Sequence, residues 1–435
     1  MDGLFRKKWV WILAGFLVSA HLPAQGTRVP TPKTEAEIRE MMKITYNQNI
    51  LPPGARKETL EGLLELGQVI VFYDHPPVVP WMSAAGIMVN APAETVFNTL
   101  TDYPHYSGFI PMTKGATKEK VGPNLYNVSY DIQVNMVFFK YGMQYGVYHY
   151  DRPPFRTDWS HSWGEFNINV GFWELIPTAD GTRTMAFYSV HSEPRGKFLN
   201  MLYSREPVLE VMTNVMTATM VTRAVKSEAE KRYRAGGGKC PAGKKGRKIF
   251  DLLAEDPASM KKFLERGKLL VLEDGPTVYV TSGTITPVSR DQAWRVITDF
   301  QEYPRFMPAV KKVEFLEKGE KGPRYFWEIA IDLMVLNYSY NYQAEYVMKP
   351  PESITWNMTQ ENAQSVTGFW RLVESEDKTL LFNGSTADLR KMGAILSYAL
   401  KVEPTLEHAI LGCQSLVNIS TLKSEIEKQA KARGR

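Results

Sequence analysis

The sequence predicts an α+β fold that is built twice in one chain. A pattern of rare residues recurs at a constant offset of 197 positions. Each copy also places several strand-like runs between a short helix and a long helix, and the long helix is apolar on one face. An antiparallel sheet with one apolar face needs such a helix to cover it. The length of 435 residues fits two or three domains.

The internal repeat is visible at tryptophan, proline and glycine positions. The motif Thr101-Asp102-Tyr103 returns as Thr298-Asp299-Phe300, and Gly171-Phe172-Trp173 returns as Gly368-Phe369-Trp370. Because the matches keep one offset over about 140 residues, they indicate a tandem duplication of one domain. Further pairs at this offset are Gly86 and Gly283, Phe97 and Trp294, Trp159 and Trp356, and Pro153-Pro154 and Pro350-Pro351.

The N-terminus has the layout of a secretory signal peptide. A basic segment (residues 6–8) precedes an apolar run (residues 9–20), and residues 21–24 contain a small residue and a turn suited to cleavage. The apolar run is shorter than the roughly 20 residues of a membrane-spanning helix, so an uncleaved anchor is the weaker alternative. We therefore predict a signal peptide over residues 1–24, an N-terminal extension over residues 25–60, and an exported protein that is periplasmic or secreted.

A basic, glycine-rich segment separates the two copies. Residues 233–250 combine a triple glycine, a proline and basic residues without apolar periodicity, which is typical of a solvated linker. Residues 226–248 hold nine Lys or Arg against two Glu, so the rest of the chain is close to neutral. This charge suits transient contact with an anionic membrane surface. Its place outside a folded face argues against nucleic-acid binding. The predicted domains are residues 61–232 and 251–435.

Local patterns give the order of elements within each copy. In the first copy, a short strand over residues 86–90 precedes a helix over residues 91–101, and the segment that ends at Pro111 forms a short helix and a turn. A long helix over residues 206–231, with Pro207 at its start, closes the copy. The expected strands between them are residues 125–134, 138–150, 156–163, 171–176 and 184–191.

The residues around the short helix carry a motif of their own. It consists of Ala93-Glu94, Phe97, Thr101-Asp102-Tyr103, Tyr106 and Phe109-Ile110-Pro111. This motif resembles the opening of domains of the SRPBCC superfamily, with the polyketide-cyclase and coenzyme-Q-binding, START-like branch as the nearest match. The resemblance covers about 145 residues of each copy. It implies two tandem helix-grip (START-like) domains. Each would be a curved antiparallel sheet wrapped around a long C-terminal helix, with a deep apolar cavity between them.

Aromatic residues on the expected strands are the candidates for the cavity wall. Alternation along the strand places Trp159, His161 and Trp163 on a single face. If that face is inward, it lines an apolar pocket, and if it is outward, it forms a patch of the kind that marks an interface. Ordinary core packing is the alternative for each residue. The residues predicted to bind ligand are Tyr145, Trp159, Trp163, Met212, Met216, Tyr342, Trp356 and Cys413.

The two long helices differ along one stripe. Met212, Met216 and Met220 are spaced by one helical turn, and Cys413 takes the place of Met216 in the second copy. Methionine adapts to varied apolar partners. We therefore predict that the first cavity is plastic, that the second differs in volume, and that the two copies bind ligand unequally. Packing in the core is the alternative interpretation of the stripe.

No catalytic or metal-binding pattern stands out. His149, His161 and His191 lie in the strand region of the first copy, but the residues at the same offset in the second copy are not histidines. Asp102 and Asp299 occupy equivalent positions and are interpreted as turn or helix-end residues. The sequence has none of the common hydrolase or metalloprotease motifs. It therefore predicts no metal, no cofactor and no enzyme activity.

Three classes of function fit these observations. The preferred one is an exported protein that binds a lipid or another hydrophobic small molecule in helix-grip cavities, as a carrier, transfer protein or sensor. Each buried CH₂ group would contribute about 0.8 kcal/mol to such binding. The second is an enzyme of the aromatase/cyclase or hydrolase kind that acts on an apolar substrate. The third is a protein-interaction scaffold whose cavities are filled by its own side chains.

Overall fold

The structure is a computed structural model of the 435-residue chain. The predicted signal peptide (residues 1–24) and the linker segment 242–247 lie outside the described residues. Among the described residues, no helix has both the length and the hydropathy that crossing a membrane requires. The described ranges are residues 33–46, 48–73, 83–135, 140–194, 207–241, 248–273, 278–333, 336–358, 367–391, 397–398, 400–401 and 405–433.

The first copy contains the expected elements and two strands that were not expected. The helix predicted over residues 91–101 is α5 (Ala93–Leu100), and the long closing helix is α7 (Pro207–Ala235). The unexpected strands are β1 (Gln68–Tyr73) and β3 (Thr113–Gly122). The remaining elements are α2 (Glu35–Met41), α3 (Lys43–Tyr46), α4 (Lys57–Leu66), β2 (Ser83–Val89), η1 (Tyr103–Gly108), β4 (Leu125–Asn135), β5 (Lys140–Arg152), β6 (Arg156–Gly164), β7 (Phe166–Pro177) and β8 (Thr184–Pro194).

The second copy repeats this order. Ser289 caps α10 (Arg290–Thr298) by a capping box with Gln292, as a serine before a helix predicts. The copy ends in α13 (Thr405–Arg433). Its other elements are α8 (Ile249–Glu255), α9 (Pro257–Arg266), β9 (Gly267–Glu273), β10 (Tyr279–Thr286), η2 (Phe300–Glu302), α11 (Tyr303–Phe306), β11 (Val310–Lys318), β12 (Pro323–Leu333), β13 (Leu336–Lys349), β14 (Ser353–Met358), β15 (Thr367–Ser375), β16 (Lys378–Thr386) and η3 (Leu389–Lys391).

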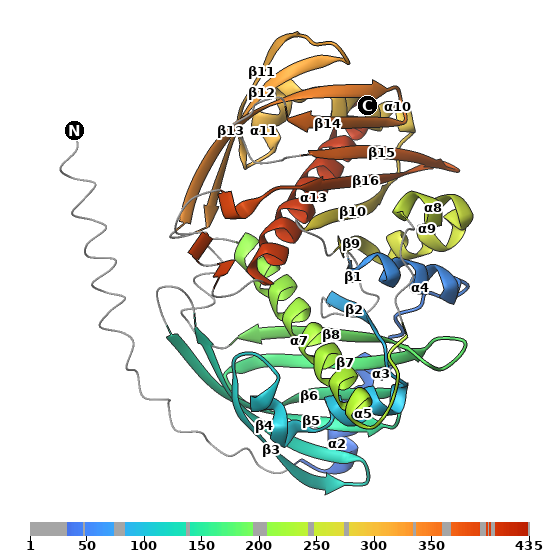
Figure 1. The fold of residues 1–435 in the computed structure, drawn as a ribbon, viewed down its shortest axis with the longest axis vertical. Coiled ribbons are helices and arrows are strands. Elements are labelled where there is room, and N and C mark those ends of the chain that lie inside the picture. The colour runs from blue at the N-terminus through green and yellow to red at the C-terminus, as the bar shows by residue number, and fades with distance from the viewer. Residues whose placement is uncertain are drawn as a thin grey trace, which may run out of the picture.

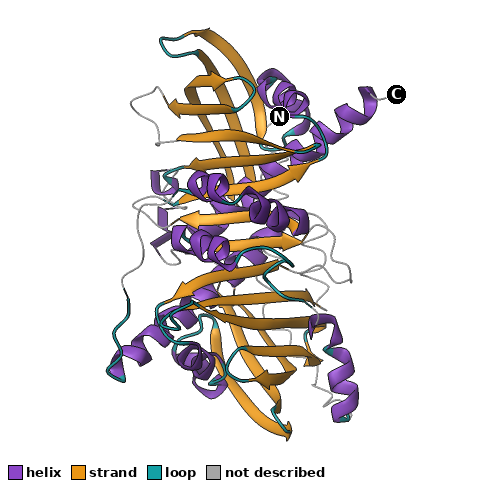
Figure 2. Cartoon of the chain, turned by 90° about the vertical axis from the view of Figure 1, so that its right-hand side faces the viewer, coloured by secondary structure: helices purple, strands orange, loops and turns teal. Residues whose placement is uncertain are grey.

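All sixteen strands of the described chain belong to one antiparallel sheet (Figure 1). The order is β11-β12-β13-β14-β15-β16-β10-β9-β1-β2-β8-β7-β6-β5-β4-β3, so the two copies meet where β9 pairs with β1. Each half of the sheet curves around its own long helix (Figure 2). This architecture confirms the predicted α+β fold with two tandem helix-grip units.

The junction between the copies is nearly symmetric. Ile70 of β1 lies opposite Leu270 of β9, and these two residues are equivalent at the offset of 200 that relates Gly67 to Gly267 in this part of the repeat. Val69 and Val71 face a core beneath α4, α8 and α9, whereas Ile70 faces a core beneath the long helices. Both faces of these central strands are therefore buried, which explains why each strand is a continuous apolar run rather than an alternating one.

The long helices cover the inner side of each half-sheet. Helix α7 packs on β2 and α5, α13 packs on β10, and the two helices contact each other across the junction. Figure 1 shows them following one another along the same side of the sheet. The space between each helix and its half-sheet is therefore where the sequence predicted a cavity.

Candidate functional site

The second copy encloses a cavity of about 100 Å³ between its half-sheet and α13. Tyr342 and Trp356, two of the residues predicted to bind ligand, line it. Aromatic side chains from four neighbouring strands form the wall, and α13 closes the opposite side. The principal lining residues are Trp327, Tyr342, Tyr346, Trp356 and Trp370 from the strands, and Leu411, Gln414 and Asn418 from α13.

The aromatic wall is held by stacking and by close contact with the sheet. The rings of Trp327 and Tyr342 are parallel to within 3°, with centroids 6.1 Å apart. Trp356 lies over Gly368 on the neighbouring strand, where a Cβ atom would come within 2.3 Å of the indole ring. Trp159 and Gly171 form the same pair in the first copy. The repeated glycine is therefore required by the ring that covers it.

Amide and aliphatic hydroxyl side chains line this cavity from two elements that contact each other, β16 and α13. They are Asn383, Ser385 and Thr386 on β16 and Gln414 and Asn418 on α13. Asn383 is buried, and its Nδ2 donates to the carbonyl of Phe369 at 3.2 Å. The cavity thus has an aromatic wall and uncharged amides where β16 meets α13.

In the first copy, Tyr188 lies beside the equivalent aromatic residues. Its ring stacks on Trp159, with centroids 5.4 Å apart, and contacts Trp173 at 5.0 Å. Trp173 pairs with Tyr188 across β7 and β8, and its equivalent Trp370 pairs with Asn383. Asn383 therefore takes the place of Tyr188 in the second copy. Replacing a tyrosine ring by a shorter amide leaves room there.

The first copy instead contains a buried polar network centred on His149. The Tyr103 hydroxyl lies 3.0 Å from Nδ1 of His149, and the Tyr130 hydroxyl lies 3.2 Å from Nε2. Thr157 lies 3.4 Å from Nδ1 and donates its own proton to Asp151 at 2.7 Å. Thr157 is thus committed as a donor to Asp151, and both ring nitrogens of His149 have hydroxyl partners.

His149 is neutral in the folded protein. Its burial, assisted by the nearby positive charge of Lys118, lowers its pKa to about 3. The unfolded chain protonates this ring near pH 6.5. The unfolded state therefore binds more protons between these two values, and stability falls as the pH falls through that window.

Replacing His149 with Phe is expected to flatten the acid limb of the stability profile. Wild-type protein should lose at least about 2 kcal/mol more stability than H149F between pH 7 and pH 4, because only the wild type pays to protonate a buried imidazole on unfolding. Urea denaturation at several pH values measures this. The matched control is His105→Gln, since His105 is exposed. Parallel profiles for wild type and H149F would contradict the assignment.

The other predicted residues of the first copy have different outcomes. Tyr145 stacks on Tyr130 at 5.2 Å, so it belongs to the same aromatic cluster as Trp159. The prediction that Trp163 shares a face with Trp159 is wrong. A β-bulge between β5 and β6 shifts the register, so Trp163 lies opposite Gly146 and covers it on the other face of the sheet.

The helix residues predicted to bind ligand do not line the cavity where the structure describes them. The side chains of Met212 and Met216 lie outside the described residues. Met220 of the same stripe packs in the core at the junction between the copies. Cys413 is buried and is not among the lining residues of the second cavity, and burial raises the pKa of its thiol to about 12. Cys413 and Cys240 are not joined by a disulfide.

The sequence reasoning did not identify the polar end of the cavity. Asn383, Gln414 and Asn418 have no motif that marks them, and only comparison of the two copies distinguishes them. At a fixed offset of 197, Tyr188 would correspond to Ser385 rather than to Asn383. The turn between β15 and β16 is two residues shorter than its counterpart, which changes the correspondence.

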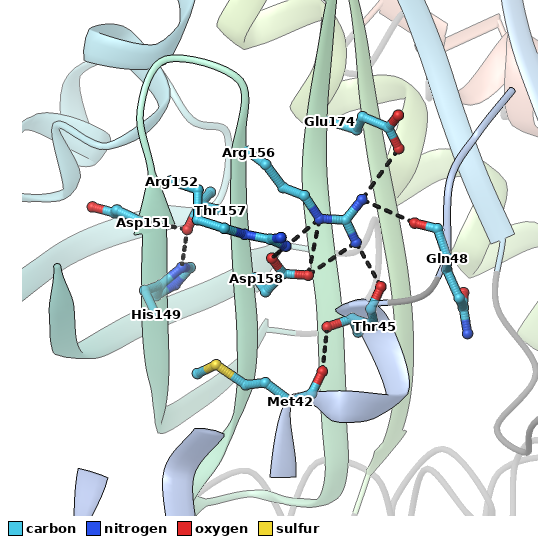
Figure 3. A network of polar contacts seen from close by, with 10 residues as sticks. All are labelled: Met42, Thr45, Gln48, His149, Asp151, Arg152, Arg156, Thr157, Asp158 and Glu174. Atoms are coloured by element: carbon cyan, nitrogen blue, oxygen red, sulfur yellow. Dashed lines mark hydrogen bonds and ion pairs between the residues drawn. The ribbon is translucent and has the colours of Figure 1, made fainter. Parts of the chain in front are cut away.

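A second polar network holds the N-terminal extension against the outer face of the first copy (Figure 3). Arg156 forms an ion pair with the fully buried Asp158 at 3.0 Å. The same guanidinium donates to the carbonyl oxygens of Thr45 at 2.6 Å and Gln48 at 2.9 Å. It also lies 3.2 Å from Glu174. One buried arginine thus joins β6, β7 and the segment that follows α3.

The chain matches one protein-family model and is similar to several solved structures. The family model described as "Polyketide cyclase / dehydrase and lipid transport" matches residues 89–221 and 286–411. No match was found among curated proteins.

Among solved structures, the chain is similar to the di-domain ARO/CYC protein StfQ of the steffimycin biosynthetic pathway. The two are 13% identical over 80% of this chain and 99% of that one, with a TM-score of 0.28. It is also similar to the Zhui aromatase/cyclase of Streptomyces sp. R1128, at 19% identity over 36% and 98% of the two chains and a TM-score of 0.28. A STAR-related lipid transfer protein of Xanthomonas axonopodis matches at 15% identity over 35% and 93%, with a TM-score of 0.24.

Proposed function

The chain belongs to the polyketide cyclase/dehydrase and lipid transport family, and from that premise we propose that it binds a hydrophobic small molecule in its second copy. The observation that carries the proposal is the aromatic cavity enclosed between the half-sheet and α13. The first copy has the same framework, but Tyr188 occupies the equivalent space. The two copies accordingly bind ligand unequally, with the second copy as the binding unit.

The size of the cavity limits what it holds. Its volume of about 100 Å³ exceeds the 10–15 Å³ or so that one water needs, and falls below the roughly 300–1,000 Å³ of typical ligand sites. A compact apolar group fits without rearrangement, whereas a long acyl chain requires the aromatic wall to move. Burial of six CH₂ groups would contribute about 5 kcal/mol before the costs of ordering.

We propose that this binding serves a carrier or sensing role outside the cytoplasm. The basic and apolar segments at the N-terminus support export. Transport through water suits a protein that shields an apolar molecule. Transient membrane contact would rely on the basic linker. Within α7, Glu228 and Glu230 form ion pairs with neighbouring Lys and Arg side chains. The positive charge that would contact the membrane is therefore that of residues 239–248.

An enzyme of the aromatase/cyclase or hydrolase kind is the second candidate. The contact of Tyr130 with His149 favours it, because a phenol and an imidazole held together in an aromatic cluster can orient a substrate by hydrogen bonds. The ring of Tyr188 lies among these aromatic residues and occupies the volume that a substrate would need. Binding in the second copy is therefore the preferred function.

Replacing Asn383 with Tyr is expected to abolish ligand binding. The new ring would fill the cavity as Tyr188 fills the first copy, at a cost of about 1–3 kcal/mol in stability. Native mass spectrometry of the purified protein, followed by organic extraction, should find one hydrophobic molecule per wild-type chain and none in N383Y. Ser424→Tyr, at an exposed position of α13, is the matched control and should retain the ligand. A wild-type mass without ligand after incubation with a lipid mixture would refute the proposal.

A further inference from the structure

We propose that the ligand of the second copy is an uncharged molecule with an apolar body and a hydrogen-bonding group at one end, which lies between β16 and α13. This inference rests on the proposed function and specifies the chemical class of its ligand. It follows from the side chains that line the cavity and from how they differ from those of the first copy.

The first argument is the absence of charge. Among the described residues that line the cavity, none is Asp, Glu, Lys, Arg or His. The tyrosines in the wall stay protonated, because burial raises the pKa values of Tyr342 and Tyr346 well above their ordinary value. A ligand carboxylate or phosphate would therefore lose its water without gaining a partner of opposite charge, which is strongly unfavourable.

The second argument is the position of the neutral polar groups. Asn383 from β16 and Asn418 from α13 are on elements that face each other across the cavity, and Gln414 lies one turn before Asn418. A side-chain amide offers both a donor and an acceptor. A hydroxyl, carbonyl or amide group of the ligand would be bound at this end, while its apolar part contacts the aromatic wall.

The third argument is that both features are specific to the second copy. The positions of Asn383 and Asn418 are held by Tyr188 and Val221 in the first copy. The amides are therefore not part of the shared framework that builds the sheet and the helix.

Ionisable side chains show the opposite difference between the copies, because they are present in the first copy and absent at the equivalent positions of the second. Lys118, His149 and Asp151 of the first copy correspond to Phe315, Tyr346 and Met348 in the second. The second copy lacks these charges on the wall formed by β11 and β13 and has amides at the other end. This exchange makes its cavity selective for a neutral ligand with one polar end.

Three probes of one shape test the inference. All three share a flat apolar ring system. Naphthalene has no polar group, 2-naphthol has a neutral hydroxyl, and 2-naphthoate has a negatively charged carboxylate. Isothermal titration of the full chain at pH 7.5 should give the highest affinity for 2-naphthol. We expect naphthalene to bind about 5-fold more weakly, as one lost hydrogen bond predicts. We expect 2-naphthoate to bind at least about 100-fold more weakly, because its charge is buried unpaired.

Variants locate the polar group. Asn418→Leu and Asn383→Leu keep the side-chain volume but remove the amide, so each should weaken 2-naphthol about 5-fold and leave naphthalene unchanged. Using both variants guards against loss of folding in one of them. Asn383→Tyr should remove binding of all three probes.

The outcomes separate this inference from the proposed function. If N383Y abolishes binding but 2-naphthoate binds within tenfold of 2-naphthol, the inference of a neutral ligand is overturned and the binding site stands. If neither leucine variant changes the preference for 2-naphthol over naphthalene, the assignment of the polar end is overturned. If N383Y binds all three probes as the wild type does, the proposed function fails as well.

Discussion

Replacing Arg156 with Met is expected to lower the free energy of unfolding by about 3–5 kcal/mol. The substitution keeps an unbranched side chain over Phe172 but leaves the buried charge of Asp158 with one partner, Arg152, in place of two. It also removes the donors to the carbonyl oxygens of Thr45 and Gln48. Breaking a buried pair from one side is costly because the remaining charge stays desolvated.

Arg156→Met should also loosen the N-terminal extension locally, in addition to lowering the stability of the whole protein. Amide hydrogen exchange should accelerate in residues 43–50, because Arg156 binds two carbonyl oxygens of this segment (Figure 3). Urea denaturation measures the change in stability. Removing both charges in R156M/D158N should recover part of it, since the double variant leaves no unpaired carboxylate.

A surface arginine provides the matched control for Arg156. Arg324 pairs with Glu317 at 2.9 Å, and the two side chains are 34% and 63% exposed, whereas Asp158, the partner of Arg156, is fully buried. Arg324→Met should therefore change stability by no more than about 1 kcal/mol. A loss in R156M as small as that in R324M would show that the network does not hold the N-terminal extension.

Replacing Tyr188 with Asn is expected to open the first copy and to destabilise it. The substitution gives the first copy the residue that the second has at the equivalent position. Loss of the half-buried ring that contacts Trp159 and Trp173 should lower the free energy of unfolding by about 2–4 kcal/mol. Part of that loss should return when an apolar ligand occupies the new space.

Binding stoichiometry gives the sharper readout of this substitution. Titration with 2-naphthol should rise from one site per chain in the wild type to two in Y188N, and the variant N383Y/Y188N should retain only the new site. Tyr398→Asn is the control, because Tyr398 is 62% exposed and its loss should change stability by only about 0.5 kcal/mol. One site in Y188N, with stability reduced as expected, would contradict the assignment of Tyr188 as the residue that fills the first cavity.

Sequence patterns predicted the long elements well and the central strands not at all. Helices α7 and α13 were predictable because their apolar periodicity extends over many turns. Strands β1 and β9 contain short apolar runs, such as Val69 to Phe72, whose periodicity does not separate a strand from a buried helix. Their pairing joins the two copies into one sheet, and neither copy alone carries a signal for it.

The aromatic residues show what the pattern within a single strand does not predict. Alternation placed Trp159 and Trp163 on one face, and it failed because a β-bulge between them shifts the register. In the second copy, Tyr342 and Trp356, for which the strand pattern left a pocket wall, an exposed patch and core packing open, line the cavity between sheet and helix. Whether a ligand contacts them is a prediction that the titrations above address.

The sequence by itself determined the duplication, the order of elements in each copy and the aromatic character of the strands. Rare residues at a constant offset and periodic apolar positions are local properties, so they can be read without a structure. Only the tertiary structure decided which residue lies beside the aromatic wall in each copy. That depends on the register between paired strands. The turn between β15 and β16 is two residues shorter than its counterpart in the first copy, and this difference places Asn383 rather than a tyrosine opposite Trp370. Register is set by pairing between distant segments, and a single strand does not encode it.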